Sequence, residues 1–386
     1  AFEYTEASRA RSLLYSMGGS SSPSVAAVQV RMPQGAQLIE YAALDDKLLI
    51  FVLSKNNFKV FERQISLDQL TDKVLNFRRL ILEKLDSSAL ARELYDLLIR
   101  PSELTFNDGN ETCIVPDKIL NNLPFGALMS ASGRYLIQDA QLTLSPSAAV
   151  YLECSNRAST FESERDERLL VVGNPSFDRV AFPSLPPLPA AAQEAERVAG
   201  YYNGPVPPAK LIGTGARAED VKREIKRSKV VHLATHYVVV EESPMKSKLL
   251  LAAEPGFGSA GQNSLSPGFL QADEIYKLKP LNARLVVLSA CQSGVEHYYN
   301  GEGMVGMSRV FVASGVPLVV ASFWQVQDEV TRDLMVEFHR IRREDRVRTV
   351  EALRQAQLQM LSSRFERYRL PYYWAAFTVI GGHADY

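Results

Sequence analysis

The sequence predicts an α/β protein in which a mainly parallel sheet, with helices on both faces, is preceded by an accessory α/β domain. In the second half of the chain, short continuous apolar runs alternate with helical stretches. These runs lack the polar–apolar alternation of a half-exposed strand, so we expect both faces of each strand to be buried. The length of 386 residues also exceeds what one core usually organises, which favours two domains.

The first part of the chain predicts a helix, a linker, a meander of strands and a second helix. Apolar residues at helical spacing predict the first helix at residues 1–17, and GGSSSPS at 18–24 predicts a flexible linker. Apolar runs at 36–44 and 47–54 flank an Asp-Asp turn and predict antiparallel strands, with a third strand directly after them. One long helix is expected at about 67–98.

The rest of the chain predicts alternating strands and helices. Short apolar runs predict strands at 111–116, 168–175, 230–236, 284–289 and 317–322, and LTLSPS at 142–147 predicts a strand followed by a Ser-Pro helix start. Amphipathic stretches predict helices at 190–202, 217–228, 303–314, 327–342 and 347–361, and a stretch rich in Gly and Ser predicts a loop at 258–268. We therefore expect an N-terminal helix and linker (1–24), an accessory domain (25–165) and the parallel-sheet domain (166–386).

The composition excludes several classes of protein. Lysine and arginine number 43 and aspartate and glutamate 44, so no basic excess predicts direct contact with nucleic acid. No apolar run reaches the length of about 18 residues that predicts a membrane span. The three cysteines, Cys113, Cys154 and Cys291, are odd in number and widely spaced, which indicates a reducing compartment and hence the cytoplasm.

Two predicted strands each deliver a reactive side chain at their carboxyl end, namely His236 and Cys291. Ligands of open parallel sheets bind at this edge. A thiol is only slightly ionised near neutral pH, so a nucleophilic cysteine needs a nearby imidazole, which can also protonate a leaving amine. The alternatives are a packed core thiol and a core histidine with satisfied hydrogen bonds. His232, on the same strand, is expected to be structural or to support the site; no ligand cluster predicts a metal, and no cofactor is expected.

The C-terminal half resembles the CHAT family of caspase-like cysteine peptidases, in the clan that also holds separase and gingipain. Several separate motifs in the same order carry this resemblance, and NLPFGAL (122–128) and RYLIQDA (134–140) extend it into the first half. The C-terminal motifs are HLATH (232–236), VVLSACQSG (286–294), GEGMVGMSRVFVASGV (301–316), VASFWQVQDEVT (320–331) and PYYWAAFTVIG (371–381).

The resemblance implies a caspase-like sheet preceded by an accessory or pseudo-caspase domain. It implies a cysteine endopeptidase that cleaves a protein substrate through a thioacyl intermediate, with Cys291 as nucleophile and His236 as general acid and base. The backbone N–H groups of Tyr237 and Cys291 would stabilise the oxyanion. Family members usually carry Gly after the histidine, and Tyr237 keeps the backbone donor while changing the local backbone shape.

Three further residues are candidates near the site. Asp328 either caps the helix that begins beside it or, as the resemblance to separases implies, receives an arginine at the P1 position of the substrate. Trp324 is expected in the core or in the wall of this substrate pocket. Glu302 lies in the loop after the cysteine motif and either orients the site or caps the following helix.

The resemblance also implies a regulatory partner. Tetratricopeptide (TPR) repeats often lie upstream in this family, so residues 1–17 are expected to be the end of such an array, or the chain is controlled by another regulatory module. The first residue is Ala rather than Met, which favours a piece of a longer protein. Two alternatives remain open: a catalytically silent caspase-like scaffold or sensor, and a small-molecule hydrolase, which would need a closed apolar pocket.

Overall fold

The computed structural model describes most of the chain, including His236, Tyr237, Trp324 and Asp328. The predicted nucleophile Cys291 and Glu302 lie outside the described residues, as does nearly all of the loop predicted at 258–268. None of the helices in the described part is both long enough and apolar enough to span a membrane. The described residues are 1–9, 11–19, 23–106, 110–161, 167–240, 242–253, 268–289, 297–299 and 303–386.

Strands and helices alternate along most of the chain, as expected for an α/β protein. The strands are β1 (Gln37–Ala43), β2 (Leu48–Ser54), β3 (Asn57–Arg63), β4 (Glu111–Val115), β5 (Gln141–Leu144), β6 (Leu169–Gly173), β7 (Ala209–Ile212), β8 (Val230–Ala234), β9 (Tyr237–Val238), β10 (Lys248–Leu250), β11 (Phe269–Gln271), β12 (Leu285–Leu288), β13 (His297–Tyr299), β14 (Gly303–Val305), β15 (Leu318–Ser322) and β16 (Phe377–Gly381). The helices are α1 (Phe2–Ala7), α2 (Arg11–Ser16), α3 (Val25–Arg31), α4 (Leu67–Leu82), α5 (Ser88–Leu98), α6 (Leu136–Asp139), α7 (Ala148–Ser159), α8 (Pro189–Gly200), α9 (Ala218–Ile225), α10 (Ala272–Lys277), α11 (Met307–Ala313), α12 (Asp328–Glu344), α13 (Thr349–Leu361) and α14 (Pro371–Trp374).

Eleven of the described strands form one continuous sheet in the order β3-β2-β1-β4-β5-β16-β15-β12-β8-β6-β7. The strands β15, β12, β8, β6 and β7 are parallel to one another, and so are β1, β4, β5 and β16. The two parallel blocks meet where β15 pairs antiparallel with β16, and β2 and β3 extend the far edge as antiparallel strands. The predicted parallel sheet is therefore confirmed, as a part of a larger mixed sheet.

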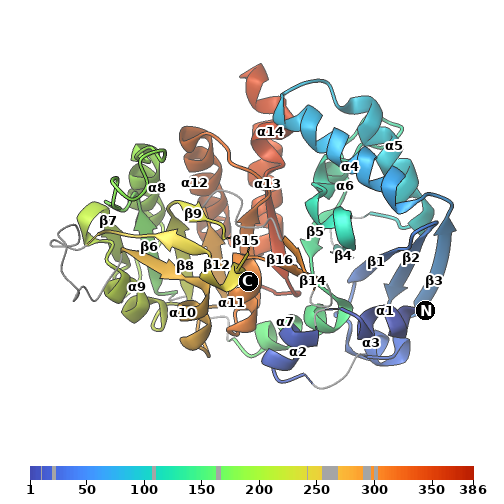
Figure 1. Ribbon diagram of the computed structural model, residues 1–386, viewed down its shortest axis with the longest axis horizontal. Coiled ribbons are helices and arrows are strands. Elements are labelled where there is room, and N and C mark those ends of the chain that lie inside the picture. Colours follow the sequence, from blue (N-terminus) through green and yellow to red (C-terminus); the bar gives the residue numbers. More distant parts are fainter. Residues whose placement is uncertain are drawn as a thin grey trace.

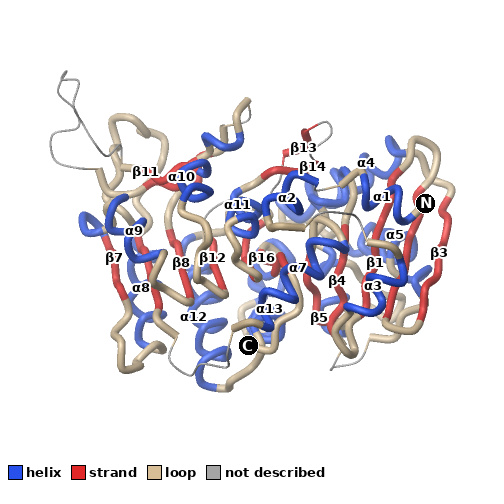
Figure 2. Tube along the Cα trace, turned by 90° about the horizontal axis from the view of Figure 1, so that it is seen from below, coloured by secondary structure: helices blue, strands red, loops and turns tan. Residues whose placement is uncertain are grey.

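Helices cover both faces of this sheet (Figures 1 and 2). In Figure 1, α8, α12, α13 and α4 lie on one side, and α9, α10, α11 and α7 lie on the other. Every residue of β6, β8, β12 and β15 is consequently buried. Because neither face meets water, these strands need apolar side chains at every position, which explains their uninterrupted apolar sequences.

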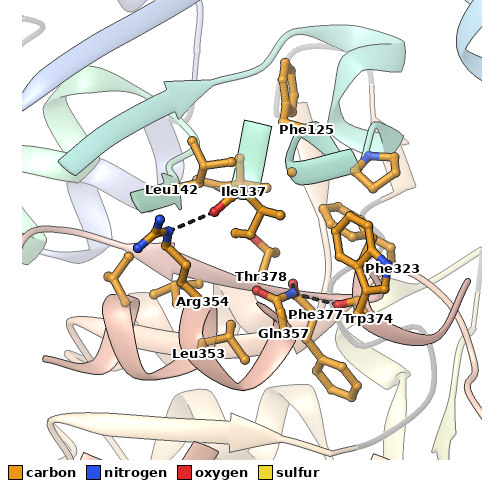
Figure 3. Close-up of a pocket in the computed structure, with 16 residues that line it drawn as sticks. Phe125, Ile137, Leu142, Phe323, Leu353, Arg354, Gln357, Trp374, Phe377 and Thr378 are labelled. Carbon is orange, nitrogen blue, oxygen red and sulfur yellow. Dashed lines mark hydrogen bonds between the residues drawn. The ribbon is translucent and has the colours of Figure 1, made fainter. Parts of the chain in front are cut away.

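Helix α13 joins the two halves of the molecule around a small cavity (Figure 3). The Arg354 side chain donates from Nε to the carbonyl of Ile137 at 2.8 Å, and Gln357 Nε2 donates to the carbonyl of Trp374 at 2.7 Å. The cavity measures about 30 Å³, which is room for one or two waters and not for a substrate. This junction is therefore structural, and the predicted domain boundary at 165/166 stays a prediction.

The predicted helix at 1–17 is wrong in one respect, because two short helices, α1 and α2, occupy this stretch. Both carboxylate oxygens of Glu6 accept hydrogen bonds from the first turn of α7, at Ala148 N and Ala149 N. Arg9 reaches in another direction and forms an ion pair with Asp117 at 3.2 Å. These tertiary contacts replace a continuous helix, since they direct neighbouring side chains to different parts of the domain.

The predicted long helix at 67–98 is also two helices, α4 and α5. Lys84 adopts a left-handed backbone conformation with φ 59°, which ends the first helix. The carboxylate of Asp86 then accepts a hydrogen bond from Ser88 N at 2.9 Å and starts the second. The helical periodicity continues across the break and therefore concealed it.

The helix predicted at 303–314 begins later than expected, at Met307. Its first residues instead form β14, which pairs antiparallel with β13 in a hairpin. Several short elements were not predicted from the sequence, namely the strands β7, β13 and β16, the helices α3, α6, α10 and α14, and the small antiparallel sheet β11-β10-β9. Elements of this size bury too few side chains to give a recognisable period.

Candidate active site

The carboxyl ends of β8, β12 and β15 meet at one edge of the sheet, because the three strands are parallel and adjacent. Thr235 and Ser289, which follow β8 and β12, and Ser322, the last residue of β15, line a cavity of about 180 Å³. This volume exceeds that of a few waters and can take an amino-acid side chain. The cavity lies where the sequence predicted a site, and Trp324 and Asp328 are also among its lining residues.

His236 follows the cavity-lining residue Thr235 and is not itself among the lining residues; it is only 3% exposed. Its Nε2 lies 2.7 Å from the carbonyl oxygen of Pro186, and the ring of Phe177 contacts it edge-on. A carbonyl only accepts hydrogen bonds, so the network assigns the proton to Nε2 and leaves Nδ1 as the basic nitrogen. Burial lowers the pKa of His236, while the bond to Pro186 opposes this shift. The imidazole is therefore neutral near pH 7, the form needed to accept a proton from a thiol.

The position of Cys291 relative to His236 stays a prediction, because residues 290–296 lie outside the described part of the chain. The nearest described residue is Ser289, which lines the cavity two positions before the cysteine. Tyr237 is half-buried and begins β9, which pairs with β10 beyond the carboxyl edge of the main sheet. Its predicted role as an oxyanion donor likewise stays a prediction.

Asp328 combines features of both hypotheses. It is the first residue of α12, yet its Oδ2 accepts a hydrogen bond from Ala190 N at 2.7 Å, so it caps α8 rather than its own helix. It also lines the cavity, where burial, together with Glu194 and Glu329, raises its pKa. Trp324 is buried in the cavity wall, and its Nε1 donates to the carbonyl of Tyr372 at 3.0 Å.

The sequence analysis missed a second acidic residue of the cavity, Glu194 on α8. Its Oε1 lies 2.7 Å from His232 Nε2, whereas its Oε2 is buried and has no hydrogen-bond partner among the described residues. The signal was present in the helix sequence, because Glu194 occupies a buried position together with alanines one turn before it and beside it. A charged residue at such a position is rare without a partner or a function.

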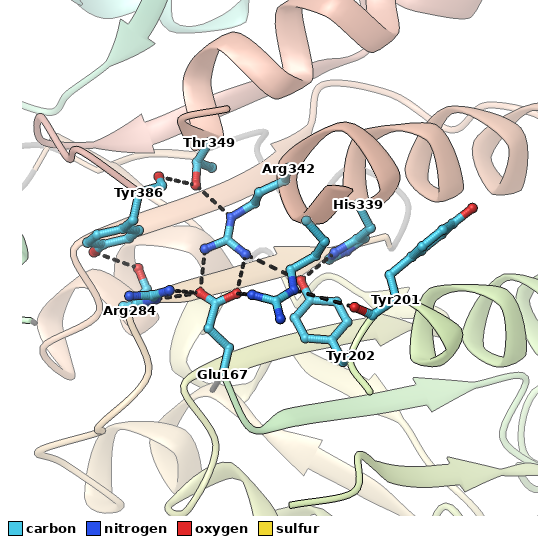
Figure 4. A network of polar contacts seen from close by, with 9 residues as sticks. Glu167, Tyr201, Tyr202, Arg284, His339, Arg342, Thr349 and Tyr386 are labelled. Carbon is cyan, nitrogen blue, oxygen red and sulfur yellow. Dashed lines mark hydrogen bonds and ion pairs between the residues drawn. The ribbon is translucent and has the colours of Figure 1, made fainter. Parts of the chain in front are cut away.

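A chain of hydrogen bonds leads from Glu194 through the layer between the sheet and the helices α8 and α12. His232 Nδ1 lies 3.1 Å from His339 Nε2, and His339 Nδ1 lies 2.8 Å from the hydroxyl of Tyr202. The chain continues to Arg342, whose Nη1 donates to the Tyr202 oxygen at 3.4 Å (Figure 4). His232, expected to be structural or to support the site, therefore connects the cavity with the opposite end of the sheet.

One direction along this chain gives every ring nitrogen a matching partner. The Tyr202 oxygen accepts from Arg342, its hydroxyl donates to His339 Nδ1, and His339 donates from Nε2 to His232 Nδ1. Burial lowers the pKa of His339 far below its usual value, which keeps that ring neutral, as this assignment requires. His232 then carries its proton on Nε2 and donates it to Glu194. Glu194 Oε1 is therefore an acceptor in this arrangement.

Comparison with known proteins agrees with the motifs. A model of the CHAT domain matches residues 88–382. Tetratricopeptide repeat protein 28 of Mus musculus is 27% identical over 334 residues, and the Homo sapiens protein of the same name is 26% identical over 329 residues. Each of these matches covers 75% of this chain but only 13% of the relative, so the chain corresponds to a small part of those proteins.

The fold is similar to that of separase from Saccharomyces cerevisiae, solved in complex with securin. The TM-score is 0.58 at 11% sequence identity, and the match covers 92% of this chain and 30% of the separase chain. The mainly parallel sheet with helices on both faces is thus the caspase-like fold of separase. The chain belongs to the CHAT-domain family, whose caspase-like fold is related to that of cysteine peptidases.

Proposed function

We propose that this chain is a cysteine endopeptidase in which His236 and Cys291 form the catalytic dyad. The observation that carries the proposal is the orientation of His236, whose Nε2 is held by the Pro186 carbonyl at 2.7 Å. Its Nδ1 remains available as a base, and the cysteine follows two residues after a cavity-lining serine. A strand-end imidazole fixed in one tautomer beside a side-chain-sized cavity suits acyl transfer.

In the proposed reaction, the Cys291 thiol transfers its proton to His236, and Sγ attacks the carbonyl carbon of the scissile peptide bond. The N–H groups of Tyr237 and Cys291 stabilise the oxyanion. The C–N bond then breaks as His236 protonates the leaving amine, and a thioester remains. His236 next removes a proton from water, which attacks the thioester, and the acid product and the free thiol are released.

The cavity of about 180 Å³ is the proposed pocket for the substrate's P1 side chain, with Trp324 as its wall and Asp328 on its lining. A buried carboxylate favours a cationic side chain over an apolar one, because an apolar occupant would leave the charge without a partner. We therefore propose that the enzyme cleaves after Arg. The hydrogen bond from Ala190 occupies one oxygen of Asp328, so this residue shares the recognition with a second group.

A regulatory module and a cytoplasmic location belong to the same proposal. The curated relatives are named for tetratricopeptide repeats, which supports control by such an array or by another partner. The two described cysteines, Cys113 and Cys154, are buried free thiols, as expected for a reducing compartment. We therefore expect low basal activity of the isolated chain.

Alkylation tests the dyad, because the two described thiols, Cys113 and Cys154, are buried. Burial, with smaller contributions from nearby acidic groups, raises the pKa of Cys113 and brings that of Cys154 to about 12, so both resist iodoacetamide in the folded protein. We expect native protein at pH 7 to be alkylated at Cys291 alone, and His236→Gln to slow this reaction at least about tenfold. Peptide mapping by mass spectrometry measures it, and His383→Gln is the control. An unchanged alkylation rate of Cys291 in His236→Gln would reject the proposed dyad.

One observation favours a catalytically silent module instead. His236 is buried against Phe177 and Pro186, so a substrate reaches it only if the surrounding segments move. Incubation with a library of peptides, compared with Cys291→Ala, separates the two functions. Cleavage that depends on Cys291 supports the peptidase, whereas alkylation at Cys291 without any cleavage, also when the tetratricopeptide repeats of the mouse relative are added, supports the scaffold.

A further inference from the structure

We propose that Glu194, rather than Asp328, is the main specificity-determining residue of the cavity, and that it recognises a guanidinium group. This inference rests on the proposed function, since it names the side chain that the P1 pocket takes. Glu194 is 1% exposed, lines the cavity, and its Oε2 has no hydrogen-bond partner in the described part of the chain. A buried oxygen in this state is the best acceptor that the cavity offers to a ligand.

The charge balance of the cavity favours a cation. Two acidic residues, Glu194 and Asp328, are among its lining residues, and no lysine, arginine or histidine is among those described. Buried carboxylates without a cationic partner are unstable, so a positively charged ligand would relieve the repulsion between them.

The two carboxylates lie at different levels along α8. Asp328, on α12, binds Ala190 N in the first turn of α8, whereas Glu194 lies about 6 Å further along α8 from Ala190. A ligand that enters from the carboxyl edge passes Asp328 before it reaches Glu194. This depth suits a long side chain with a terminal cation, and Ser289, whose hydroxyl lacks a partner among the described residues, adds a polar group to the same cavity.

The hydrogen-bond chain below the cavity holds the Glu194 carboxylate in one orientation, with Oε1 bonded to His232. His232 donates to Oε1, and the chain through His339 and Tyr202 ends at Arg342, so Oε1 is always an acceptor already in use. The carboxyl group cannot rotate without breaking this bond, and Oε2 is left for the ligand. A guanidinium is preferred over an ammonium, because its several N–H groups can bind Glu194, Asp328 and Ser289 at once.

Binding to the full chain with Cys291→Ala tests the proposal without any catalysis. The probes are agmatine, which carries a guanidinium, pentylamine, which carries an ammonium, and pentanol, which is neutral. We expect calorimetry to give the affinity order agmatine, pentylamine, pentanol. We expect Glu194→Gln to weaken agmatine binding about ten- to a hundredfold, and Asp328→Asn to weaken it less. An agmatine affinity that is unchanged in Glu194→Gln, or a pentanol affinity equal to that of agmatine, would overturn the proposal.

Wild-type protein gives an independent readout if Glu194→Gln fails to fold. Agmatine at Glu194 must shift the ¹⁵N resonances of the His232 ring, whose Nε2 donates to the same carboxylate, while His383, bonded to Glu111, serves as the internal control. An unchanged His232 signal at saturating agmatine contradicts the proposal. The peptide acetyl-Gly-Gly-Arg-amide, added in place of agmatine, distinguishes a P1 side chain from a free small molecule.

The outcomes for this pocket and for the peptidase are separable. Agmatine binding that depends on Glu194, without cleavage that depends on Cys291, keeps the cation site and rejects the proposed function. Cleavage that depends on Cys291 without an arginine preference rejects the cation site alone.

Discussion

Two buried carboxylates at opposite ends of the sheet are held in contrasting ways. Glu167, before β6, is surrounded by three arginines, with Arg342 Nη1 at 2.6 Å, Arg343 Nη1 at 3.1 Å and Arg284 also in contact (Figure 4). Glu194, at the carboxyl end, is bonded to His232 without an arginine or lysine partner in the described part of the chain, and it shares its cavity with another acid, Asp328. The hydrogen-bond chain through His339 connects these two carboxylates.

This difference indicates that Glu167 has a structural role, whereas Glu194 is suited to bind a ligand. Burial alone would raise the pKa of Glu167, but Arg342, Arg284 and Arg343 outweigh it and lower the value to about 2. The acidic pair in the cavity has no comparable cation in the described part of the chain, and the pKa of Asp328 is raised by burial and by Glu194. A protein keeps such an unbalanced pair where an incoming cation supplies the missing charge.

The largest effect is expected for Glu167→Gln. Removal of this carboxylate takes away the counter-charge of the buried Arg342 guanidinium, which should lower the free energy of unfolding by about 3–5 kcal/mol. Urea unfolding measures the change. Glu103→Gln, which breaks the exposed ion pair with Lys59, is the matched control and should change stability by less than about 1 kcal/mol. Equal effects of both variants would refute the contrast.

Acid should destabilise the wild-type protein through the same group. The folded-state pKa of Glu167 is depressed, so its contribution is complete above the unfolded value of 4.5 and is lost as the pH falls towards 2. A depression of this size corresponds to about 3 kcal/mol. Unfolding free energies measured from pH 6 to pH 2 should therefore fall more steeply for wild type than for Glu167→Gln. Parallel curves would show that the arginines do not hold this carboxylate ionised.

The smallest effect on stability is expected for Glu194→Gln. The glutamine oxygen can still accept the proton of His232 Nε2, and the change removes a charge that the described residues do not balance. We expect the free energy of unfolding to change by less than about 1 kcal/mol, in either direction. A loss as large as that of Glu167→Gln, in thermal and urea unfolding, would show that Glu194 is structural rather than reserved for a ligand.

The sequence predicted the parallel block of the fold because its strands are buried on both faces, and an uninterrupted apolar run records that burial. The antiparallel pairing of β16 with β15 could not be predicted in this way, because an apolar run has the same sequence pattern in parallel and in antiparallel pairing. The strand-end position of His236 was predictable, but its bond to Pro186 joins residues 50 apart in the chain. Asp328 was expected to cap its own helix or to bind substrate, and only the tertiary structure brings Ala190 to it.

The most direct test of the account compares arginine with citrulline at P1 in otherwise identical peptides. Citrulline has the shape of arginine without its charge. We predict that kcat/KM for the arginine peptide exceeds that for the citrulline peptide at least about tenfold in the wild-type protein, and that the ratio falls towards one in Glu194→Gln. Asp328→Asn should reduce the ratio only in part. The central claim is that the unbalanced carboxylate in the cavity selects the substrate. Equal kcat/KM values for the two peptides, in cleavage that depends on Cys291, would contradict it. An arginine-to-citrulline ratio that stays unchanged in Glu194→Gln would contradict it as well.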